Sequence, residues 1–474
     1  MRFEKKAALA LCATFMAMLI VPLMATDLRP GVVSEIENRT LKPFPALFDA
    51  DGGRNRDLIS GFEGWFDDHI GFREEMFTLN ARIQYDLFHS SGSERVLTGQ
   101  DGWLFYTGDD NLTIAEGNYP NFDESVLADI CQVQQRIAQE LAGQGIEYVI
   151  VLPPSKISIY PERLRGDFEV RETPVDILAD YLEACSDLKV VRLKQALLEE
   201  KAESGELLYY KTDTHWNARG VYSGYREIVR LLNGWGIVDT GPVDVSFLDE
   251  RTLRDLTNMI VGDDERYHEY AAVSVDVHDP AAEPVEAGEL ISRLAAQSGA
   301  RRTLCYSTHD PSRPSFLVLG DSMFLDSCMT RLLAENCSEL TGLWTYDLTQ
   351  ELLDATKPDV VFFEMTERLL NLMGSKNRDL AQASVLVERD GDHVDIYYRD
   401  HGDYPRMWFP TWSEQDGQDD LVWYEAERSD EATWHVRVEL SHHPSTGIFN
   451  VHFYQGTCTE DLAHIRSETF EIAP

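Results

Sequence analysis

A serine that follows a short apolar run is the first residue whose type and position could do chemistry. The run Phe316–Leu319 leads into Gly320, Asp321 and Ser322, and a helix is expected next. In a doubly wound sheet, sites form at the carboxyl ends of strands, and the backbone N–H groups that begin the next helix can stabilise an oxyanion. Asp and Ser are also favoured helix N-caps, so the same residues could simply begin the helix. On this pattern alone, Ser322 is only a candidate nucleophile.

Such a nucleophile needs a base to take its proton and an acid to hold that base. Asp-x-His can supply both, since residues two apart on an extended chain point the same way. The pattern occurs three times: Asp67/His69, Asp213/His215 and Asp276/His278. Context favours the second copy, which follows the strand-like run 207–210 and precedes a helix. Asp213 and His215 could equally make a loop hydrogen bond or a metal-ligand pair, although no third metal ligand is evident.

Other side chains near these motifs are candidates for substrate contact. Lys156, Trp216 and Asn217 are the candidates in the main domain, and Lys156 could instead be an ordinary surface lysine. Five aromatic residues of the C-terminal segment could stack on sugars or form a β-sheet core: Trp408, Trp412, Trp423, Tyr424 and Trp434. We expect no metal and no cofactor.

The segment that must position Ser322 and His215 alternates between helical and strand-like patterns. Short apolar runs predict strands at 147–152, 189–193, 316–319 and 359–364, and 3.6-residue periodicity predicts helices at 125–142, 175–184, 218–232 and 326–335. This alternation predicts an α/β fold whose parallel sheet is covered on both faces. Residues 61–90 are also expected to be helical, and the polar, acidic stretch 262–300 to be an irregular insertion.

The last part of the chain follows a different pattern. After about residue 385, polar and apolar residues alternate at 393–398, 434–440 and 449–453, with turn residues between these runs. Alternation of this kind predicts a small antiparallel β-sandwich. The boundary between the two parts is expected near 375–384.

The N-terminal residues predict export. Met1–Lys6 carries three cations and one anion, and Ala7–Ala25 is 19 uncharged residues long. We expect a transmembrane signal anchor over 7–25, with 1–6 in the cytoplasm and 26–474 outside, although a cleaved signal peptide is the alternative. Cys12 lies in that segment. The six other cysteines permit 15 full disulfide pairings, or buried thiols: Cys131, Cys185, Cys305, Cys328, Cys337 and Cys458.

Composition limits the partners. The chain has 474 residues, 43% of them hydrophobic, so it can bury a sizeable core. Its net charge of −40 argues against nucleic acid and against tight binding of a polyanion, because both need clustered cations.

Motifs in order along 31–375 resemble the alginate O-acetyltransferase-like family, whose members are permuted relatives of the SGNH hydrolases. They are Glu37-Asn38-Arg39 with Leu41 and Phe44-Pro45; Asp68-His69-Ile70-Gly71-Phe72-Arg73; Gly102-Trp103-Leu104-Phe105; Pro154 and Lys156 with Tyr160-Pro161-Glu162; Asp213-Thr214-His215-Trp216-Asn217; Gly320-Asp321-Ser322; and Pro358-Asp359-Val360 with Glu367-Arg368. The resemblance implies an SGNH hydrolase-like doubly wound sheet in a 26–378 domain. It also implies a catalytic triad of Asp213, His215 and Ser322, and places Asp67 and His69 in a structural motif.

The segment 385–474 resembles the GBS Bsp-like domain found in cell-wall-associated proteins of Gram-positive bacteria. The matching residues are Trp412-Ser413, Gly417-Gln418-Asp419-Asp420, Trp423-Tyr424, His442-His443, Gly447, and His452 with Tyr454. Alginate producers of the first family usually lack such a module. The resemblance therefore points away from alginate and toward a Gram-positive-type envelope.

Together these features predict a membrane-anchored O-acetyltransferase of a cell-surface polysaccharide that works through a Ser322 acyl-enzyme. A multi-span membrane O-acyltransferase is the acetyl supplier that the resemblance implies. The alternatives are a carbohydrate O-acetylesterase with the same triad, and a non-catalytic cell-wall glycan-binding protein.

Overall fold

The computed structural model describes residues 2–29, 31, 33–34, 39–48, 53–93, 95–109, 111–119, 122–166, 172–262, 264–377, 384–400, 404–414, 418–429, 433–443, 447–456 and 462–472. Several residues named above lie outside these ranges: Met1, Glu37, Asn38, Gly417 and Cys458. The expected boundary at 375–384 falls partly outside them too, so the domain limits 26–378 and 385–474 stay predictions.

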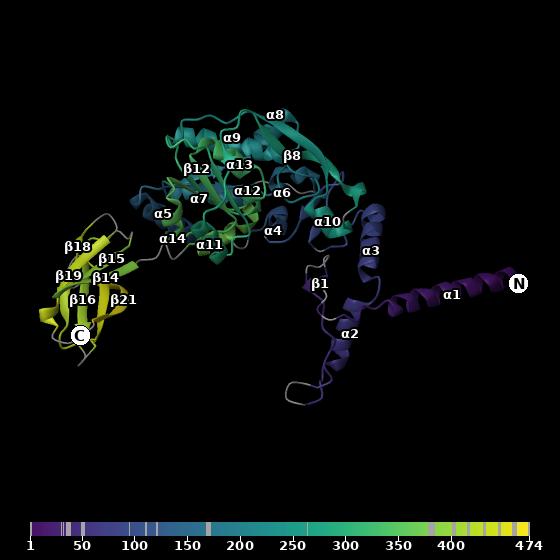
Figure 1. Ribbon diagram of the computed structural model, residues 1–474, viewed down its shortest axis with the longest axis horizontal. Helices are drawn as coiled ribbons and strands as arrows, with labels where there is room; N and C mark the ends of the chain where they lie inside the picture. The colour runs from purple at the N-terminus through teal and green to yellow at the C-terminus, as the bar shows by residue number, and fades with distance from the viewer. Residues whose placement is uncertain are drawn as a thin grey trace.

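A seven-stranded sheet forms the centre of the larger domain (Figure 1). Its strands, in spatial order, are β6 (Lys189–Arg192), β5 (Glu147–Leu152), β13 (Val360–Glu364), β11 (Phe316–Leu319), β12 (Glu339–Leu343), β10 (Thr303–Ser307) and β9 (Glu283–Pro284). The first five run parallel, and β10 and β9 add an antiparallel edge. All four strands expected from apolar runs are confirmed.

Helices cover both faces of this sheet, as the alternation of side chains along β5 shows. Val149 and Val151 pack into one hydrophobic cluster, whereas Tyr148, Ile150 and Leu152 pack into another. The first cluster includes residues of α8 (Leu193–Ser204), α9 (Ala218–Gly234), α12 (Ser322–Leu325) and α13 (Met329–Leu333). The second includes residues of α5 (Glu124–Gly143), α7 (Pro174–Cys185), α11 (Glu289–Gln297) and α14 (Gln350–Thr356). The prediction of a doubly wound α/β fold is therefore confirmed.

Two local expectations in this domain are wrong. The stretch 262–300 is regular for much of its length: β8 (Glu269–Val277) pairs with β7 (Val245–Thr252) in an antiparallel hairpin, and α11 follows. The hairpin is hard to recognise because charged residues lie near the end of β7, and most side chains of both strands are only partly buried or exposed. The helix expected at 326–335 begins later, at Met329: α13 and the 3-10 helix η3 (Ala334–Asn336) form it, and the separate α12 begins at Ser322.

A disulfide joins Cys131 of α5 to Cys185 of α7. Both helices cover the same face of the sheet, so the bond links neighbours that lie 54 residues apart in sequence. The remaining cysteines of the described residues are free thiols: Cys12, Cys305, Cys328 and Cys337.

The N-terminal segment consists mainly of helices. α1 (Arg2–Met24) projects away from the rest of the chain in Figure 1, and α2 (Leu58–His69) and α3 (Arg73–Phe88) account for the helix expected at 61–90. No helix among the described residues is long and apolar enough to cross a membrane. The transmembrane helix expected at 7–25 is therefore not found among the described residues.

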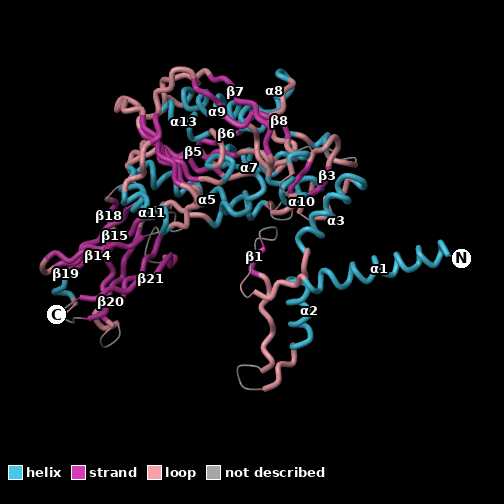
Figure 2. Tube along the Cα trace, turned by 45° about the vertical axis from the view of Figure 1, so that its right-hand side comes forward, coloured by secondary structure: helices cyan, strands magenta, loops and turns pink. Residues whose placement is uncertain are grey.

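Two four-stranded antiparallel sheets form the C-terminal sandwich (Figure 2). One contains β14 (Ser384–Asp390), β15 (His393–Arg399), β19 (Thr433–Glu439) and β18 (Glu427–Arg428). The other contains β17 (Val422–Glu425), β16 (Met407–Ser413), β20 (Gly447–Gln455) and β21 (Ala463–Ile472). Trp434 and Tyr424 pack on the core between the sheets. The antiparallel sandwich predicted from alternation is thus confirmed.

Candidate functional site

Ser322 lies in a tight turn between β11 and α12, and buried carboxylates hold that turn. Asp321 caps α12: its Oδ1 accepts from the Met323 N–H at 2.8 Å, and its Oδ2 accepts from the Tyr346 hydroxyl at 2.7 Å and the Thr366 N–H at 3.1 Å. Glu364, the last residue of β13, accepts from the Asp321 N–H at 2.8 Å. The neighbouring strand β13 therefore fixes the position of the serine.

Glu364 also explains the glycine before the turn. A Cβ on Gly320 would collide with the Glu364 carboxylate, so no other residue fits there without displacing it. Burial, followed by the charge of Asp321, raises the pKa of Glu364 well above its usual range. The turn thus rests on a buried carboxyl group whose surroundings disfavour its charged form.

The loop that carries His215 is attached to the same turn. Trp216 donates from its indole N–H to the Met323 carbonyl at 2.8 Å, which links the two segments directly. Asn217 caps α9, accepting from the Arg219 and Gly220 N–H groups at 2.9 and 3.1 Å, and donates to the Leu207 carbonyl at 2.6 Å. These hydrogen bonds therefore hold the turn that carries Ser322 and the loop that carries His215 together.

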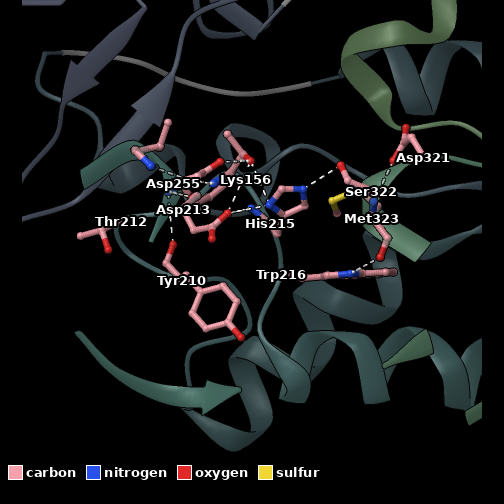
Figure 3. A network of polar contacts seen from close by, with 12 residues as sticks. Lys156, Tyr210, Thr212, Asp213, His215, Trp216, Asp255, Asp321, Ser322 and Met323 are labelled. Atoms are coloured by element: carbon pink, nitrogen blue, oxygen red, sulfur yellow. Dashed lines mark hydrogen bonds and ion pairs between the residues drawn. The ribbon is translucent and has the colours of Figure 1, made fainter. Parts of the chain in front are cut away.

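The structure brings Asp213, His215 and Ser322 into one line of contacts (Figure 3). His215 Nδ1 lies 2.6 Å from Asp213 Oδ1, and His215 Nε2 lies 2.7 Å from Ser322 Oγ. Asp213 Oδ1 also accepts from the His215 backbone N–H at 2.9 Å, which fixes the ring relative to the carboxylate. Ser322 and His215 are 107 residues apart in sequence. This geometry suits a nucleophile, a base and a group that orients the base.

The electrostatics of the pair follow from burial and mutual charge. Burial lowers the pKa of His215, but the hydrogen bond and the charge of Asp213 outweigh it, so the pKa is raised above its ordinary value of 6.5. Burial raises the pKa of Asp213, but its hydrogen bond and charge interaction with His215 outweigh that effect and lower it. Asp213 is therefore ionised across the physiological range, and His215 is a stronger base than a free imidazole.

A second carboxylate, which no sequence pattern indicates, lies beside this pair. Asp255, at the start of α10 (Asp255–Val261), accepts from the Thr214 N–H at 3.1 Å and the Thr214 hydroxyl at 2.9 Å. Burial and the charge of Asp213 raise the pKa of Asp255 to about 6. Nothing in residue spacing pairs Asp255 with Asp213, 42 positions earlier, because the hairpin of β7 and β8 brings them together.

Asp255 also supplies the third ligand that the metal reading of Asp213 and His215 lacked. Among the described residues, Asp213, His215 and Asp255 can each direct one ligand atom to within 4.8 Å of the others. His215 Nδ1 and Asp213 Oδ1 already bond to each other, however, and the free nitrogen of His215 faces Ser322. The contacts within the cluster therefore match a triad more closely than a ligand set.

The three residues expected to contact substrate lie at the site, with polar atoms directed at protein groups. Lys156, 4% exposed, donates from Nζ to the carbonyls of Tyr210, Lys211 and Asp213 at 3.2, 3.1 and 2.5 Å. Its Nζ lies 5.0 Å from the centre of the Phe105 ring. The surface-lysine alternative is therefore wrong, and Lys156 shapes the loop before His215. Substrate contact stays a prediction for all three, and Trp216 and Asn217 line a cavity of about 100 Å³ beside His215.

An oxyanion donor is available at the serine itself. Asp321 occupies the Met323 N–H, but none of the hydrogen bonds among the described residues uses the Ser322 N–H. A backbone N–H next to the nucleophile is a suitable donor to charge that develops on an acyl oxygen.

The histidines of the two other Asp-x-His pairs contact groups away from Ser322. His69 shares a contact of 2.8 Å with the Trp65 carbonyl. His278 lies 2.7 Å from the Ser246 hydroxyl, on the β7–β8 hairpin.

Comparison with known proteins agrees with this architecture. Residues 96–291 match the family described as "SGNH hydrolase-like domain, acetyltransferase AlgX". Residues 399–470 match the GBS Bsp-like repeat. Both resemblances drawn from the motifs are thereby confirmed. The first match contains Asp213 and His215 and ends before Ser322.

Curated relatives cover part of the chain. A probable alginate O-acetylase AlgJ of Pseudomonas aeruginosa is 26% identical over 195 residues, which are 40% of this chain and 45% of that protein. The Pseudomonas fluorescens AlgJ is 24% identical over 176 residues, 36% of this chain and 41% of that protein. The matched segments thus span less than half the length of these relatives.

Solved structures are similar over a longer stretch. The O-acetyltransferase domain of Pseudomonas putida AlgJ has a TM-score of 0.40 and 16% identity, and covers 60% of this chain and 97% of that domain. Bacillus cereus PatB1 with a sulfonyl adduct has a TM-score of 0.43 and 17% identity, and covers 60% of this chain and 98% of that chain.

Proposed function

We propose that the protein is an O-acetyltransferase of a cell-surface polysaccharide, and that Ser322 carries the acetyl group between donor and acceptor. The observation that carries the proposal is the 2.7 Å contact between His215 Nε2 and Ser322 Oγ, with Asp213 on the far side of the imidazole. The match to an acetyltransferase family and the similarity to probable alginate O-acetylases support acetyl as the transferred group.

The first half of the reaction loads the serine. Ser322 Oγ attacks the carbonyl carbon of the acetyl donor while His215 Nε2 takes the hydroxyl proton. The negative charge that develops on the acyl oxygen is stabilised by the Ser322 N–H. His215 then gives the proton to the leaving group, and the acetyl ester of Ser322 remains.

The second half of the reaction removes the acetyl group from Ser322. A sugar hydroxyl attacks the ester carbonyl as His215 takes its proton, and the Ser322–acyl bond breaks. The serine oxygen recovers the proton from His215, and the glycan leaves as its acetyl ester. Asp213 transfers no proton: it holds the imidazole in place and stabilises its cation.

Location and donor are part of the same proposal. The disulfide between Cys131 and Cys185 supports an oxidising compartment outside the cytoplasm. A multi-span membrane O-acyltransferase would then supply acetyl groups from inside the cell, because acetyl-CoA is cytosolic.

Labelling of the serine tests the proposal. Incubation with an activated acetyl ester, p-nitrophenyl acetate, is expected to add one acetyl group to the intact protein, and peptide mapping should place it on Ser322. Ser322→Ala should not label. Trp434→Phe, in the sandwich core, serves as a matched handling control and should label like wild type. Equal labelling of wild type and Ser322→Ala would show that another residue is the nucleophile.

The fate of the label separates transfer from hydrolysis. A transferase discharges its acetyl group faster as acceptor polysaccharide is added, and acetylated glycan accumulates. A carbohydrate O-acetylesterase with the same triad discharges to water at a rate that no glycan accelerates, and it releases acetate from acetylated polysaccharide. A purely glycan-binding protein forms no acyl-enzyme at all.

A further inference from the structure

The outer face of one sandwich sheet carries a continuous group of aromatic rings. Along β16, Met407 and Phe409 point into the core, so Trp408 and Trp412 point outward. The same alternation sends His452 and Tyr454 of β20 outward, and Trp423 of β17 stands on that face as well.

Four of these rings, together with His464 of β21, form a chain of contacts across four strands. We call them the ring platform: Trp412, Trp423, His452, Tyr454 and His464. Trp412 lies 4.7 Å from His452 and Trp423 lies 5.3 Å from Tyr454, between ring centres. His464 joins the two ends, at 5.3 Å from His452 and 5.2 Å from Tyr454. The rings therefore form one surface rather than isolated side chains.

A proline lies in a central strand of this sheet, between the two strands that carry Trp423 and Tyr454. Pro410 pairs with Trp423 in β16, which runs between β17 and β20. Proline is rare in a central strand because it removes a ladder hydrogen bond. Trp423 and Tyr454 approach each other to 5.3 Å between ring centres from the strands on either side of β16.

The platform stays open to solvent at one end. Trp423 is 43% exposed, whereas Trp412 at the other end is 8% exposed. Large exposed aromatic groups are costly on a soluble surface and usually mark a binding site. The outer face of the opposite sheet differs: Tyr397 and His435 stack there as a single pair, beside an ion pair of Asp395 with Arg437.

Charge limits what the platform can bind. Arg466 is the only Lys or Arg within the four strands of this sheet, and its Nε donates to Glu468 at 2.6 Å. Arg406, just before β16, pairs with Glu425 at 3.4 Å. Burial and the neighbouring His464 lower the pKa of His452, so that ring is neutral at neutral pH. Each nearby cation already faces a carboxylate, which disfavours a polyanionic ligand.

From these contacts we propose that the ring platform binds a neutral glycan strand. Sugar rings offer apolar C–H faces to aromatic surfaces, and their hydroxyls can bond to the edges of His and Tyr rings, which are apolar in the body and polar at the tip. Nucleic acid and uronic-acid polymers are excluded by the same charges. This site is separate from Ser322, so the protein holds a polysaccharide through one domain and modifies it with the other.

Affinity electrophoresis of the full chain tests the platform. The gels contain one soluble polysaccharide each: mixed-linkage β-glucan, xylan, galactomannan or, as the polyanion, alginate. At least one neutral polymer is expected to retard the wild type, and alginate is not. Trp423→Ala and Tyr454→Ala should each weaken that retardation by roughly tenfold or more, since central aromatic contacts dominate binding.

Matched controls keep this test independent of catalysis and of folding. Tyr397→Ala removes a stacked aromatic ring from the opposite sheet and should bind like wild type. Ser322→Ala should bind normally, and Trp423→Ala should still form the acetyl-enzyme, so the two proposals can fail separately. Lack of retardation by every neutral polymer, stronger retardation by alginate, or equal loss in Tyr397→Ala would each overturn the proposal.

Discussion

The carboxyl edge of the α/β sheet and the outer face of the sandwich sheet hold their side chains in different ways. At the first, Asp213, His215 and Ser322 come from distant segments, and buried hydrogen bonds fix them to one another. At the second, strand alternation alone directs Trp423 and Tyr454 outward, and their rings contact each other at the surface.

This difference predicts how each region responds to substitution. Groups that act through one another lose most of their effect when any one is removed, and buried polar groups left without partners cost stability. Aromatic rings on an exposed sheet face each add separately to the binding affinity and contribute little to the free energy of unfolding. The predictions below use that contrast, starting with the largest effect.

Removal of the base gives the largest effect. His215→Ala leaves Ser322 without a group to take its proton, and acetyl labelling is expected to fall by roughly a thousandfold or more. Asp213→Ala should retain more labelling than His215→Ala, because Asp213 orients the ring but transfers no proton. Rates come from stopped-flow release of p-nitrophenol. The idea fails if His215→Ala keeps a rate near that of wild type while its circular dichroism is unchanged.

Loss of the buried lysine tests whether the loop before His215 depends on its hydrogen bonds. Lys156→Met keeps much of the side-chain length but leaves the carbonyls of Tyr210, Lys211 and Asp213 without their donor. We expect a loss of about 3 kcal/mol in the free energy of unfolding, measured by urea denaturation, together with slower labelling. Lys189→Met removes an exposed ion pair with Glu147 and should cost well under about 1 kcal/mol. Equal costs for the two variants would contradict the role given to Lys156.

The same contrast explains what could be predicted from sequence. The strands at 147–152 and 359–364 were found because both of their faces are buried, which makes the runs continuously apolar. The sandwich was found because only one face of its strands is buried, which makes the pattern alternate. Both signals are local, so they require no knowledge of what packs against the strand.

The features that could not be predicted from sequence depend on tertiary contacts rather than on local patterns. Asp255 and Glu364 reach the site through tertiary contacts, and no spacing relates them to Asp213 or to Ser322. The strands β7 and β8 pair only with each other, and few of their side chains are fully buried, so their sequence does not resemble that of a core strand.

Asp255 offers a smaller, pH-dependent test. The base must be neutral to accept a proton, so kcat/KM should fall as the pH drops through the pKa of His215, which lies above 6.5. The negative charge of Asp255 contributes to that raised pKa. Asp255→Asn is therefore expected to move the acid limb of the pH–rate profile to lower pH, by up to about one unit.

Asp326→Asn provides the matched control for that shift. Asp326 lines the same cavity beside His215, but its carboxylate pairs with Arg302. The acid limb of the pH–rate profile of Asp326→Asn should therefore lie at the same pH as in the wild type. An unchanged profile in Asp255→Asn, or a shift to higher pH, would show that Asp255 does not act on His215 through its charge.

The smallest expected effect on stability belongs to the ring platform. Trp423 is half-exposed on the outer face, so Trp423→Ala should change the free energy of unfolding of the sandwich by less than about 0.5 kcal/mol. Trp434, 6% exposed in the core between the sheets, should cost about 3–5 kcal/mol when replaced by alanine. Hydrogen exchange of the β15 and β20 amides reports on the sandwich separately from the α/β domain. If Trp423→Ala weakens glycan retardation while exchange stays at the wild-type rate, the ring acts on the ligand directly. If exchange accelerates as much as in Trp434→Ala, Trp423 is part of the core and the contrast between the two regions is lost.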